Sequence, residues 1–259
     1  MYKRKYGLNE QVFDSVTPES AYWIGFLYGD GNCTQENKVR IALQWEDKPH
    51  LIAFRSFIGS IDRPIKELIT PRYHNAHIEF RSWRIHNVLK KYELTKRKEH
   101  RGTVHPDLLQ YDVASDFIRG VFDADGCFYY DGLHKNNLFA EITGRMPLLK
   151  CIKAVLVSRG VISEKKKIVK NGSIFRIRFA KENTINLIHF LYGNAPRYRL
   201  ARKYGIAKSY LDRLNDSAPI KAGEATVEFR CITVPSLLTT SANKVSSRKE
   251  NTSTKRSAT

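Results

Sequence analysis

Two ten-residue stretches of the chain share one pattern of apolar, small and acidic positions. Residues 22–31 read YWIGFLYGDG and residues 117–126 read FIRGVFDADG. Each contains a glycine, a small residue four positions later and a final Asp-Gly pair, and residue 117 lies 95 positions after residue 22. An apolar run of this kind predicts a buried helix, and the Asp-Gly pair predicts where that helix ends.

Helix start signals precede both stretches. Thr17 supplies an N-cap, Pro18 a proline at the first helical position and Glu19 an acid in the first turn. In the second copy Asp112 stands where Thr17 stood. The two predicted helices therefore match position for position, and they end near Tyr28 and Ala124.

Alternating segments follow each predicted helix. VRIALQWE (39–46), HNAHIEFRSW (74–83) and IFRIRFA (174–180) each place apolar residues on one side and polar residues on the other, as in half-buried strands. Helices are predicted over 49–59, 85–92, 147–160 and 185–192, and Asn171-Gly172 predicts a hairpin turn. The order is helix, strand, strand, helix, strand, strand, helix, twice.

This duplication predicts an α+β fold made of two pseudo-symmetric αββαββα halves. The segments expected are an N-terminal arm (1–15), a first repeat (16–110), a second repeat (111–215) and a C-terminal extension (216–259). From about residue 236 the extension is rich in Ser, Thr and Lys without apolar periodicity, which predicts disorder.

The charge of the chain points to a polyanionic partner. The 259 residues include 44 Lys and Arg against 26 Asp and Glu, a net charge of +18. No stretch approaches the ~18 consecutive apolar residues of a membrane helix, so we expect no membrane association and a soluble intracellular location, in the cytoplasm, nucleoid or an organelle matrix. The four cysteines form no CxxC pair that would indicate a zinc framework.

The small residues of the two stretches predict a close helix pair. Gly25 and Gly29, like Gly120 and Ala124, lie four residues apart on one helix face, so these faces carry almost no side chain and two backbones can approach closely. Such packing would bring Asp30 and Asp125 together. For either copy taken alone, a simple helix C-cap is the alternative interpretation.

Two carboxylates held together at the negative ends of two helices destabilise each other. A hard divalent cation removes this conflict, because Mg²⁺ accepts one or two carboxylates and completes its shell with water. On a basic protein, such a site can hold an attacking water and stabilise the charge that develops at a phosphate.

WIGFLYGDG (23–31) and IRGVFDADG (118–126) resemble the two signature motifs of single-chain LAGLIDADG homing endonucleases. The second keeps FDADG intact, and the first has Tyr28 at a position where the family name has an Asp. The resemblance covers roughly residues 16–215. It implies two antiparallel, saddle-shaped sheets along the major groove, motif helices at the interface, and acids that bind divalent metal over two scissile phosphates.

The resemblance also implies roles for individual residues. Asp30 and Asp125 match the metal-binding acids, Mg²⁺ or Mn²⁺ is the expected ion, and the carbonyls of Gly29 and Ala124 are further metal contacts. Gln44 matches a polar residue near the active centre, with Thr143 or Arg145 as its partner in the second half. Lys98 and Lys203 match the lysine that follows the last helix of each half.

The strand faces are expected to contact double-stranded DNA over a long specific site. Arginine pairs with guanine and glutamine with adenine in the major groove, while phosphate oxygens accept hydrogen bonds from arginine, histidine and glutamine side chains. A solvated sheet face is the alternative interpretation for any one of these residues. The predicted DNA contacts are Arg40, Gln44, His77, Arg81, Arg145, Arg176 and Arg178.

Two functions follow as hypotheses. The first is a monomeric, Mg²⁺-dependent homing endonuclease of a mobile element that makes a staggered double-strand break, with Asp30 and Asp125 as shared metal ligands and Gln44, Lys98 and Lys203 positioning water or stabilising charge. The second is a binding protein of the same fold that does not cleave, either an intron RNA maturase or a DNA-binding regulator.

Overall fold

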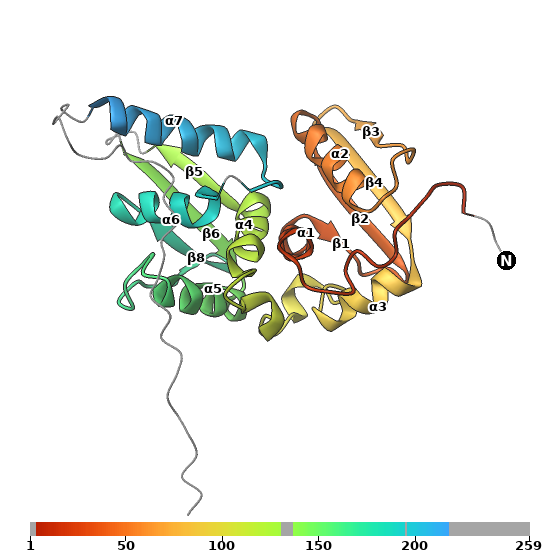
Figure 1. Ribbon diagram of the computed structural model, residues 1–259, viewed down its shortest axis with the longest axis horizontal. Helices are drawn as coiled ribbons and strands as arrows, with labels where there is room; N and C mark the ends of the chain where they lie inside the picture. Colours follow the sequence, from red (N-terminus) through yellow and green to blue (C-terminus); the bar gives the residue numbers. More distant parts are fainter. Residues whose placement is uncertain (1–3, 131–136, 195, 218–259) are drawn as a thin grey trace, which may run out of the picture.

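Two halves of the chain follow the predicted order of elements (Figure 1), and the computed structural model describes residues 4–130, 137–194 and 196–217. The first half consists of α1 (Pro18–Gly29), β1 (Gly31–Asn32), β2 (Lys38–Gln44), α2 (Lys48–Phe57), β3 (Lys66–Ile69), β4 (His74–Arg81) and α3 (Trp83–Lys91). The second consists of α4 (Ala114–Asp125), β5 (Gly126–Tyr130), β6 (Leu138–Gly144), α5 (Met146–Ser158), β7 (Val169–Asn171), β8 (Ile174–Phe179), α6 (Glu182–Tyr192) and α7 (Ala201–Ser217).

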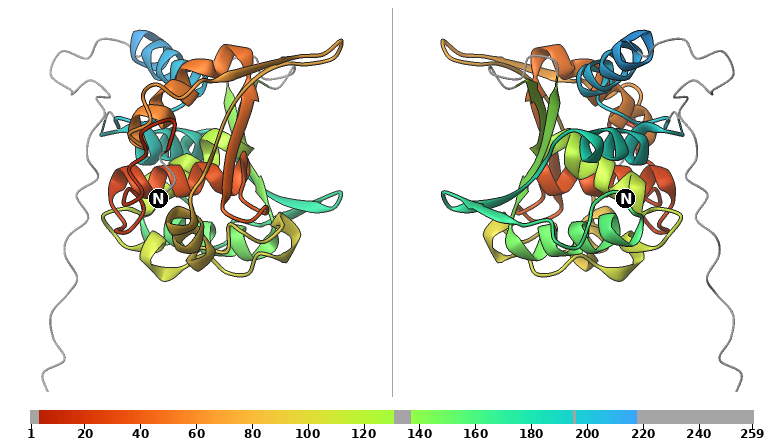
Figure 2. Two further views of the ribbon diagram at one scale, coloured as in Figure 1. Left: turned by 90° about the vertical axis from the view of Figure 1, so that its right-hand side faces the viewer. Right: turned by 90° about the vertical axis from the view of Figure 1, so that its left-hand side faces the viewer.

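Each half contains a four-stranded antiparallel sheet, in the order β1-β2-β4-β3 and β5-β6-β8-β7. The predicted alternation is confirmed. In β2, Val39, Ile41 and Leu43 are buried, and in β8 Ile177 and Phe179 are buried while Arg178 is exposed. Each sheet therefore has one face packed on helices and one open face. The β3–β4 and β7–β8 hairpins project to the same side of the molecule (Figure 2).

The start of α1 agrees with the sequence, whereas the start of α4 does not. Thr17 caps α1, because its hydroxyl accepts from the backbone N of Ser20 at 3.2 Å. The N-cap of α4 is Val113, without a side-chain cap, so the prediction that Asp112 repeats the role of Thr17 is wrong. The carbonyl of Gln110 accepts from the backbone N of Ala114, the first residue of α4, at 2.9 Å.

Two 3-10 helices connect the halves, and helix α7 ends the second half. Short 3-10 helices at Lys98–His100 and Pro106–Leu109 link α3 to α4. The second half continues beyond α6 into the 17-residue helix α7, where the first half has only the 3-10 turn. The expected disorder beyond about residue 236 concerns part of the chain outside the described residues.

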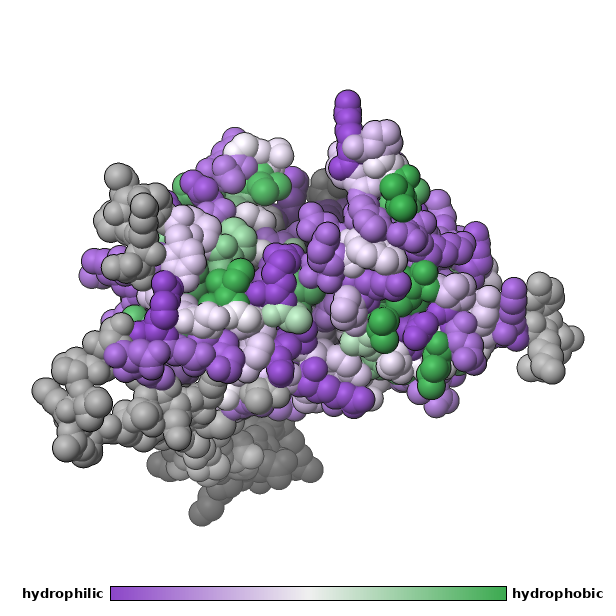
Figure 3. Space-filling view, turned by 90° about the horizontal axis from the view of Figure 1, so that it is seen from above, coloured by the Kyte–Doolittle hydropathy of each residue, from purple (hydrophilic) through white to green (hydrophobic). Residues whose placement is uncertain are grey.

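The surface is largely polar on the face that Figure 3 shows. The face seen in Figure 3 is mostly hydrophilic, with apolar residues in small separate groups. Among the described residues, no helix is long and apolar enough to cross a membrane.

Helices α1 and α4 lie side by side between the halves (Figure 1), and their backbones touch. A Cβ atom added to Gly25 would lie 2.1 Å from the carbonyl oxygen of Phe117, and one added to Gly120 would lie 2.0 Å from that of Tyr22. Real Cβ atoms do not approach backbone oxygen so closely. The predicted helix interface is present, and at both glycines it leaves no room for any side chain.

We expect Gly120→Ala to destabilise the protein by about 3 kcal/mol or more, because the new methyl group collides with backbone that cannot move independently of α1. Gly205→Ala is the matched control, since Gly205 also lies in a helix but nothing lies within 4 Å of an added Cβ. That control should gain about 0.5–1 kcal/mol. Unfolding in urea measures both, and equal effects would contradict the packing described.

Candidate active site

Asp30 and Asp125 meet where α1 and α4 end. Asp30 is the C-cap of α1, and Asp125 is the last residue of α4, one position beyond the predicted helix end. A Cβ added to Gly29 would lie 2.3 Å from the Cβ of Ala124 and 3.0 Å from Oδ2 of Asp125. The small residues at 29 and 124 are therefore what permits the two acids to come together.

The electrostatics of the pair reflect this proximity. Burial, followed by the negative charge of Asp125, raises the pKa of Asp30 to about 6, while Lys98 and Lys203 act in the opposite direction. Among the described residues no cluster of three or more His, Cys, Asp or Glu side chains is placed to hold a metal ion. The donor set at this place is two carboxylates with backbone carbonyls nearby, which is chemistry that suits Mg²⁺ and leaves room for water in its shell.

Lys98 lies beside the acids with a largely available ammonium group. Its Nζ is 3.6 Å from Oδ2 of Asp125, and its side chain is 49% exposed. It extends from the 3-10 turn Lys98–His100 of the linker between the halves. Lys98 therefore keeps donor hydrogens available for an incoming anion.

Lys203 differs from Lys98 in its environment. It is 4% exposed, and its ammonium donates to the carbonyls of Phe122, Asp123 and Gly126 at 2.8, 2.6 and 2.5 Å. These three bonds use all the hydrogens of the ammonium group. The structure thus places the ammonium group of Lys203 on the carbonyls at the C-terminal end of α4, close enough to act on the pKa of Asp30.

Arg101, which the sequence did not single out, holds the end of α1 in the same way. Its Nη1 donates to the carbonyl of Tyr28 at 2.8 Å, and Tyr28 occupies the motif position that Asp123 occupies in α4. A cation on the last carbonyls of a helix stabilises the negative end of its dipole. Arg101 ends the basic run TKRKEHR (95–101), and nothing in that run distinguishes the residue that reaches the end of α1.

The strand register distinguishes the two candidate partners of Gln44. Gly31 pairs with Ile41, and Gly126 pairs with Ile142, so Gln44 corresponds to Arg145 in the second half. Thr143 instead matches Ala42, and its hydroxyl donates to the carbonyl of Asp125 at 2.8 Å. Thr143 therefore contacts the backbone of an acid, and Arg145 holds the place equivalent to Gln44.

A cavity of about 170 Å³ opens beside Asp125. It brings together predicted site residues from the linker and from β6, but Asp30, Gln44 and Lys203 are not among its lining residues. An anion could enter this cavity with several donors around it. The lining consists of Tyr28, Lys98, Arg101, Gly102, Asp125, Thr143, Gly144, Arg145, Leu148 and Ile174.

Comparisons with known proteins identify the fold. No protein-family model matches the sequence, and no curated protein matches it. Solved structures do match. The LAGLIDADG meganuclease I-CpaMI bound to uncleaved DNA has a TM-score of 0.50 at 15% identity, covering 78% of this chain and 93% of that one. The homing endonuclease I-WcaI bound to its DNA recognition sequence has 0.51 at 11%, covering 78% and 88%. A mutant of I-SmaMI has 0.52 at 13%, covering 76% and 89%.

This chain has the LAGLIDADG homing-endonuclease fold. The resemblance drawn from the two motifs is thereby confirmed for the fold. At 11–15% identity the likeness comes from the arrangement of the elements and does not identify individual site residues.

On the open face of the first LAGLIDADG half, the predicted contact residues lie in adjacent register positions. Arg40 pairs with Glu79, Ala42 with His77 and Lys38 with Arg81. Glu79 forms ion pairs with Lys38 at 3.1 Å and Lys66 at 3.7 Å. Positive charge exceeds negative charge on this face, as nucleic-acid binding requires.

The open face of the second LAGLIDADG half carries Arg176 and Arg178. Arg176 donates to Glu141 at 3.3 Å. Arg178 lies over the rings of Tyr129 and Phe139, with its guanidinium carbon 5.4 and 5.1 Å from their centroids. Arg145 lies at the edge and donates to the carbonyl of Ser173 at 3.4 Å. Arg178 is thus oriented by two stacked aromatic rings.

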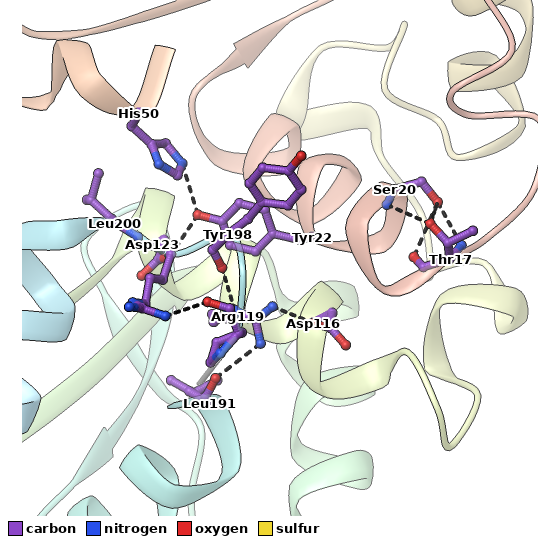
Figure 4. A network of polar contacts seen from close by, with 12 residues as sticks. Thr17, Ser20, Tyr22, His50, Asp116, Arg119, Asp123, Leu191, Tyr198 and Leu200 are labelled. Carbon is purple, nitrogen blue, oxygen red and sulfur yellow. Dashed lines mark hydrogen bonds and ion pairs between the residues drawn. The ribbon is translucent and has the colours of Figure 1, made fainter. Parts of the chain in front are cut away.

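Asp123, the first acid of FDADG, lies in a buried polar network between the halves (Figure 4). Its carboxylate, 1% exposed, accepts from the hydroxyls of Tyr22 and Tyr192 at 2.9 and 2.8 Å and from the backbone N of Leu200 at 2.8 Å. Tyr22 belongs to α1, and its hydroxyl also lies 2.9 Å from Nε2 of His50. Burial lowers the pKa of His50 to about 4, so the ring is neutral at pH 7.

Tyr28 performs the corresponding task in the first motif with the opposite hydrogen-bond polarity. Its hydroxyl donates to the carbonyl of Tyr92, the C-cap of α3, at 2.9 Å. Asp123 accepts from Tyr192, the last residue of α6. Each motif helix is therefore hydrogen-bonded to the C-terminal end of a helix of its own half, α1 to α3 and α4 to α6. A tyrosine can make this contact at the position where the family motif has an acid.

Replacing Asp123 tests this network. Asp123→Ala leaves three buried donors without an acceptor and should cost about 3–5 kcal/mol of unfolding free energy. Asp123→Asn keeps an acceptor oxygen, so its cost should be clearly smaller. Tyr28→Phe removes one hydrogen bond and should cost about 1 kcal/mol. A loss below about 1 kcal/mol in Asp123→Ala, measured by urea unfolding, would show that the network contributes little.

The raised pKa of Asp30 predicts that the free energy of unfolding depends on pH when a chelator keeps metal ions away from the protein. A carboxyl with a folded-state pKa near 6 and an unfolded value near 3.8 binds more protons when folded, so its contribution to stability falls as pH rises from about 4 to 6. Asp30→Asn should therefore be more stable than wild type at pH 7.5, by about 2–3 kcal/mol, and this advantage should vanish near pH 4. A difference that does not change with pH would contradict the raised pKa of Asp30, and with it the combined effect of burial and of the charge of Asp125.

Proposed function

We propose that this protein is a site-specific DNA endonuclease that makes a staggered double-strand break with the help of a divalent metal ion, as a homing endonuclease does. The proposal is carried by the meeting of Asp30 and Asp125 at the ends of two helices whose backbones touch. A protein that only binds nucleic acid gains nothing from two carboxylates held together, because their repulsion weakens both folding and the attraction to phosphate.

Asp30 and Asp125 would hold Mg²⁺ or Mn²⁺, and the carbonyls of Gly29 and Ala124 would be further oxygen donors. When bound, such an ion activates water at neutral pH and neutralises charge that develops on phosphate. Oxygen donors alone are what these hard cations prefer.

The residues around the acids divide into two groups by what they can reach. The Nζ of Lys98 lies 3.6 Å from Oδ2 of Asp125 and has hydrogens available to donate, so it would stabilise charge on the scissile phosphate. Gln44 and Arg145, at equivalent register positions, would orient water or phosphate. Lys203 and Thr143 contact carbonyls near the end of α4, so their role would be to position Asp125.

Double-stranded DNA would lie along the two open sheet faces, where Arg40, His77 and Arg81 meet it on one half and Arg176 and Arg178 on the other. The I-CpaMI and I-WcaI structures, which share this fold, hold DNA. Both halves of the pseudo-twofold are present in one chain, so the active species would be a monomer.

Cleavage of a plasmid library by the purified protein with Mg²⁺ or Mn²⁺ tests the proposal. Wild type should produce linear DNA cut at a defined site, and either Asp30→Asn or Asp125→Asn should reduce double-strand cutting by about 10²-fold or more while binding persists. Tight binding of one site by wild type without any cutting would instead favour the second function, a maturase or a DNA-binding regulator of the same fold.

The two lysines separate direct from positioning roles. Lys98→Met should lower the cleavage rate by about 10²-fold and leave the unfolding midpoint unchanged, because Lys98 is half exposed. Lys203→Met should lower the unfolding midpoint, because three buried carbonyls lose their donor. The reverse pattern would assign the direct role to Lys203.

A further inference from the structure

The outer strand of the first sheet carries an exposed leucine on the open face. In the pairing of β3 with β4, Leu68 lies directly opposite Asn75, and side chains that are directly opposite in an antiparallel pair point to the same face of the sheet. Side chains alternate between the two faces along a strand, so Asn75 points away from the face that buries its neighbour Ala76. Leu68 and Asn75 therefore both lie on the open face.

Packing within the protein does not account for a leucine at this position. Leu68 is 44% exposed and lies outside the hydrophobic core. Counted along the strand registers of the two sheets from Gly31 and Gly126, the residue equivalent to Leu68 in the second half is Asn171. The same fold thus holds a polar residue at the equivalent place, so the sheet does not require an aliphatic one.

The neighbours of Leu68 on the open face are polar. Asn75 lies opposite Gln44 on its other side, so one leucine and two carboxamides form a row across β3, β4 and β2. Among the residues that the structure describes, no protein group hydrogen-bonds to the side-chain amide of Gln44 or of Asn75. The next row holds Lys66 opposite His77. Leu68 is therefore an apolar group beside carboxamides whose donors and acceptors remain available.

This pair of side chains matches the major-groove edge of an A·T base pair. A carboxamide donates to N7 of adenine and accepts from the N6 amino group, and the C5-methyl group of thymine is the apolar group that this base pair presents in the major groove. The Cβ atoms of Leu68 and Asn75, as a directly opposite pair, lie about 5 Å apart. One side chain can thus meet the adenine while the other meets the thymine.

We infer that Leu68 and Asn75 determine sequence specificity by binding an A·T base pair, with Leu68 against the C5-methyl group of thymine and Asn75 hydrogen-bonded to adenine. Such binding rests on the part of the proposed function that places DNA on the open sheet faces, and not on cleavage. The β3–β4 hairpin projects to the same side as the β7–β8 hairpin (Figure 2), so a duplex held by both open faces would meet it.

Replacing thymine by uracil tests the contact, because it removes the methyl group and keeps the hydrogen-bonding groups of the base pair. A duplex that the wild-type protein selects from a random library is prepared with each thymine replaced in turn. Fluorescence anisotropy measures its binding in chelator, which prevents metal-dependent cutting. The variants are Leu68→Asn, Leu68→Met and Ile69→Asn. Ile69 is the matched control, because it is 70% exposed and lies on the opposite face of the same strand.

Wild type should bind about fourfold more weakly when one particular thymine becomes uracil, which is the loss expected for one buried methyl group. Leu68→Asn should bind the thymine and uracil duplexes equally, whereas Leu68→Met and Ile69→Asn should keep the difference. Asn75→Ala should lower the discrimination between A·T and G·C at that same base pair about tenfold, because the contacts to adenine are lost.

Two results would overturn the inference: a methyl effect of the same size in Leu68→Asn as in wild type, or no methyl effect at any thymine of the selected duplex. Failure of wild type to select a specific duplex would contradict the DNA site of the proposed function itself, and the contact of Leu68 with it. Cutting of the selected duplex with Mg²⁺, measured separately, reports on the proposed nuclease alone.

Discussion

The contact between the main chains of α1 and α4 is the constraint on which the rest of the structure depends. Gly25 and Gly120 each face a carbonyl of the other helix at a distance that excludes even a methyl group. Because the helices touch backbone to backbone, their C-terminal ends also meet, and with them Asp30 and Asp125. The interface between the halves and the candidate active site are consequently one feature, and neither can be altered without the other.

The negative ends of two helices and two carboxylates lie close together at this point. Cationic side chains that donate to backbone carbonyls offset this negative charge. Arg101 holds the end of α1, and Lys203 holds the end of α4. Lys98 is the cation whose hydrogens remain available beside Asp125. The site is therefore asymmetric although the fold is nearly twofold, because the first half reaches its helix end from the linker and the second half reaches it from α7.

The same asymmetry appears at Tyr28 and Asp123, which occupy equivalent positions in the two motifs. Tyr28 donates to the end of α3, and Asp123 accepts from the end of α6 and from Tyr22 across the interface. Either polarity connects a motif helix to its own half. Across the interface Asp123 accepts a hydrogen bond from Tyr22, whereas Tyr28 makes an edge-to-face ring contact with Phe117.

The sequence by itself determined the repeat, the order of elements, the inward and outward faces of the strands and the closeness of Asp30 and Asp125. These follow from local periodicity and from small residues spaced by one helical turn, which any single chain displays along its length. Tertiary structure decided the rest. Sequence spacing does not give the distance from a side chain to a carbonyl or a strand partner elsewhere in the fold. Four features depend on such distances: the lack of a side-chain cap from Asp112, the burial of Lys203, the role of Arg101 and the match of Gln44 with Arg145.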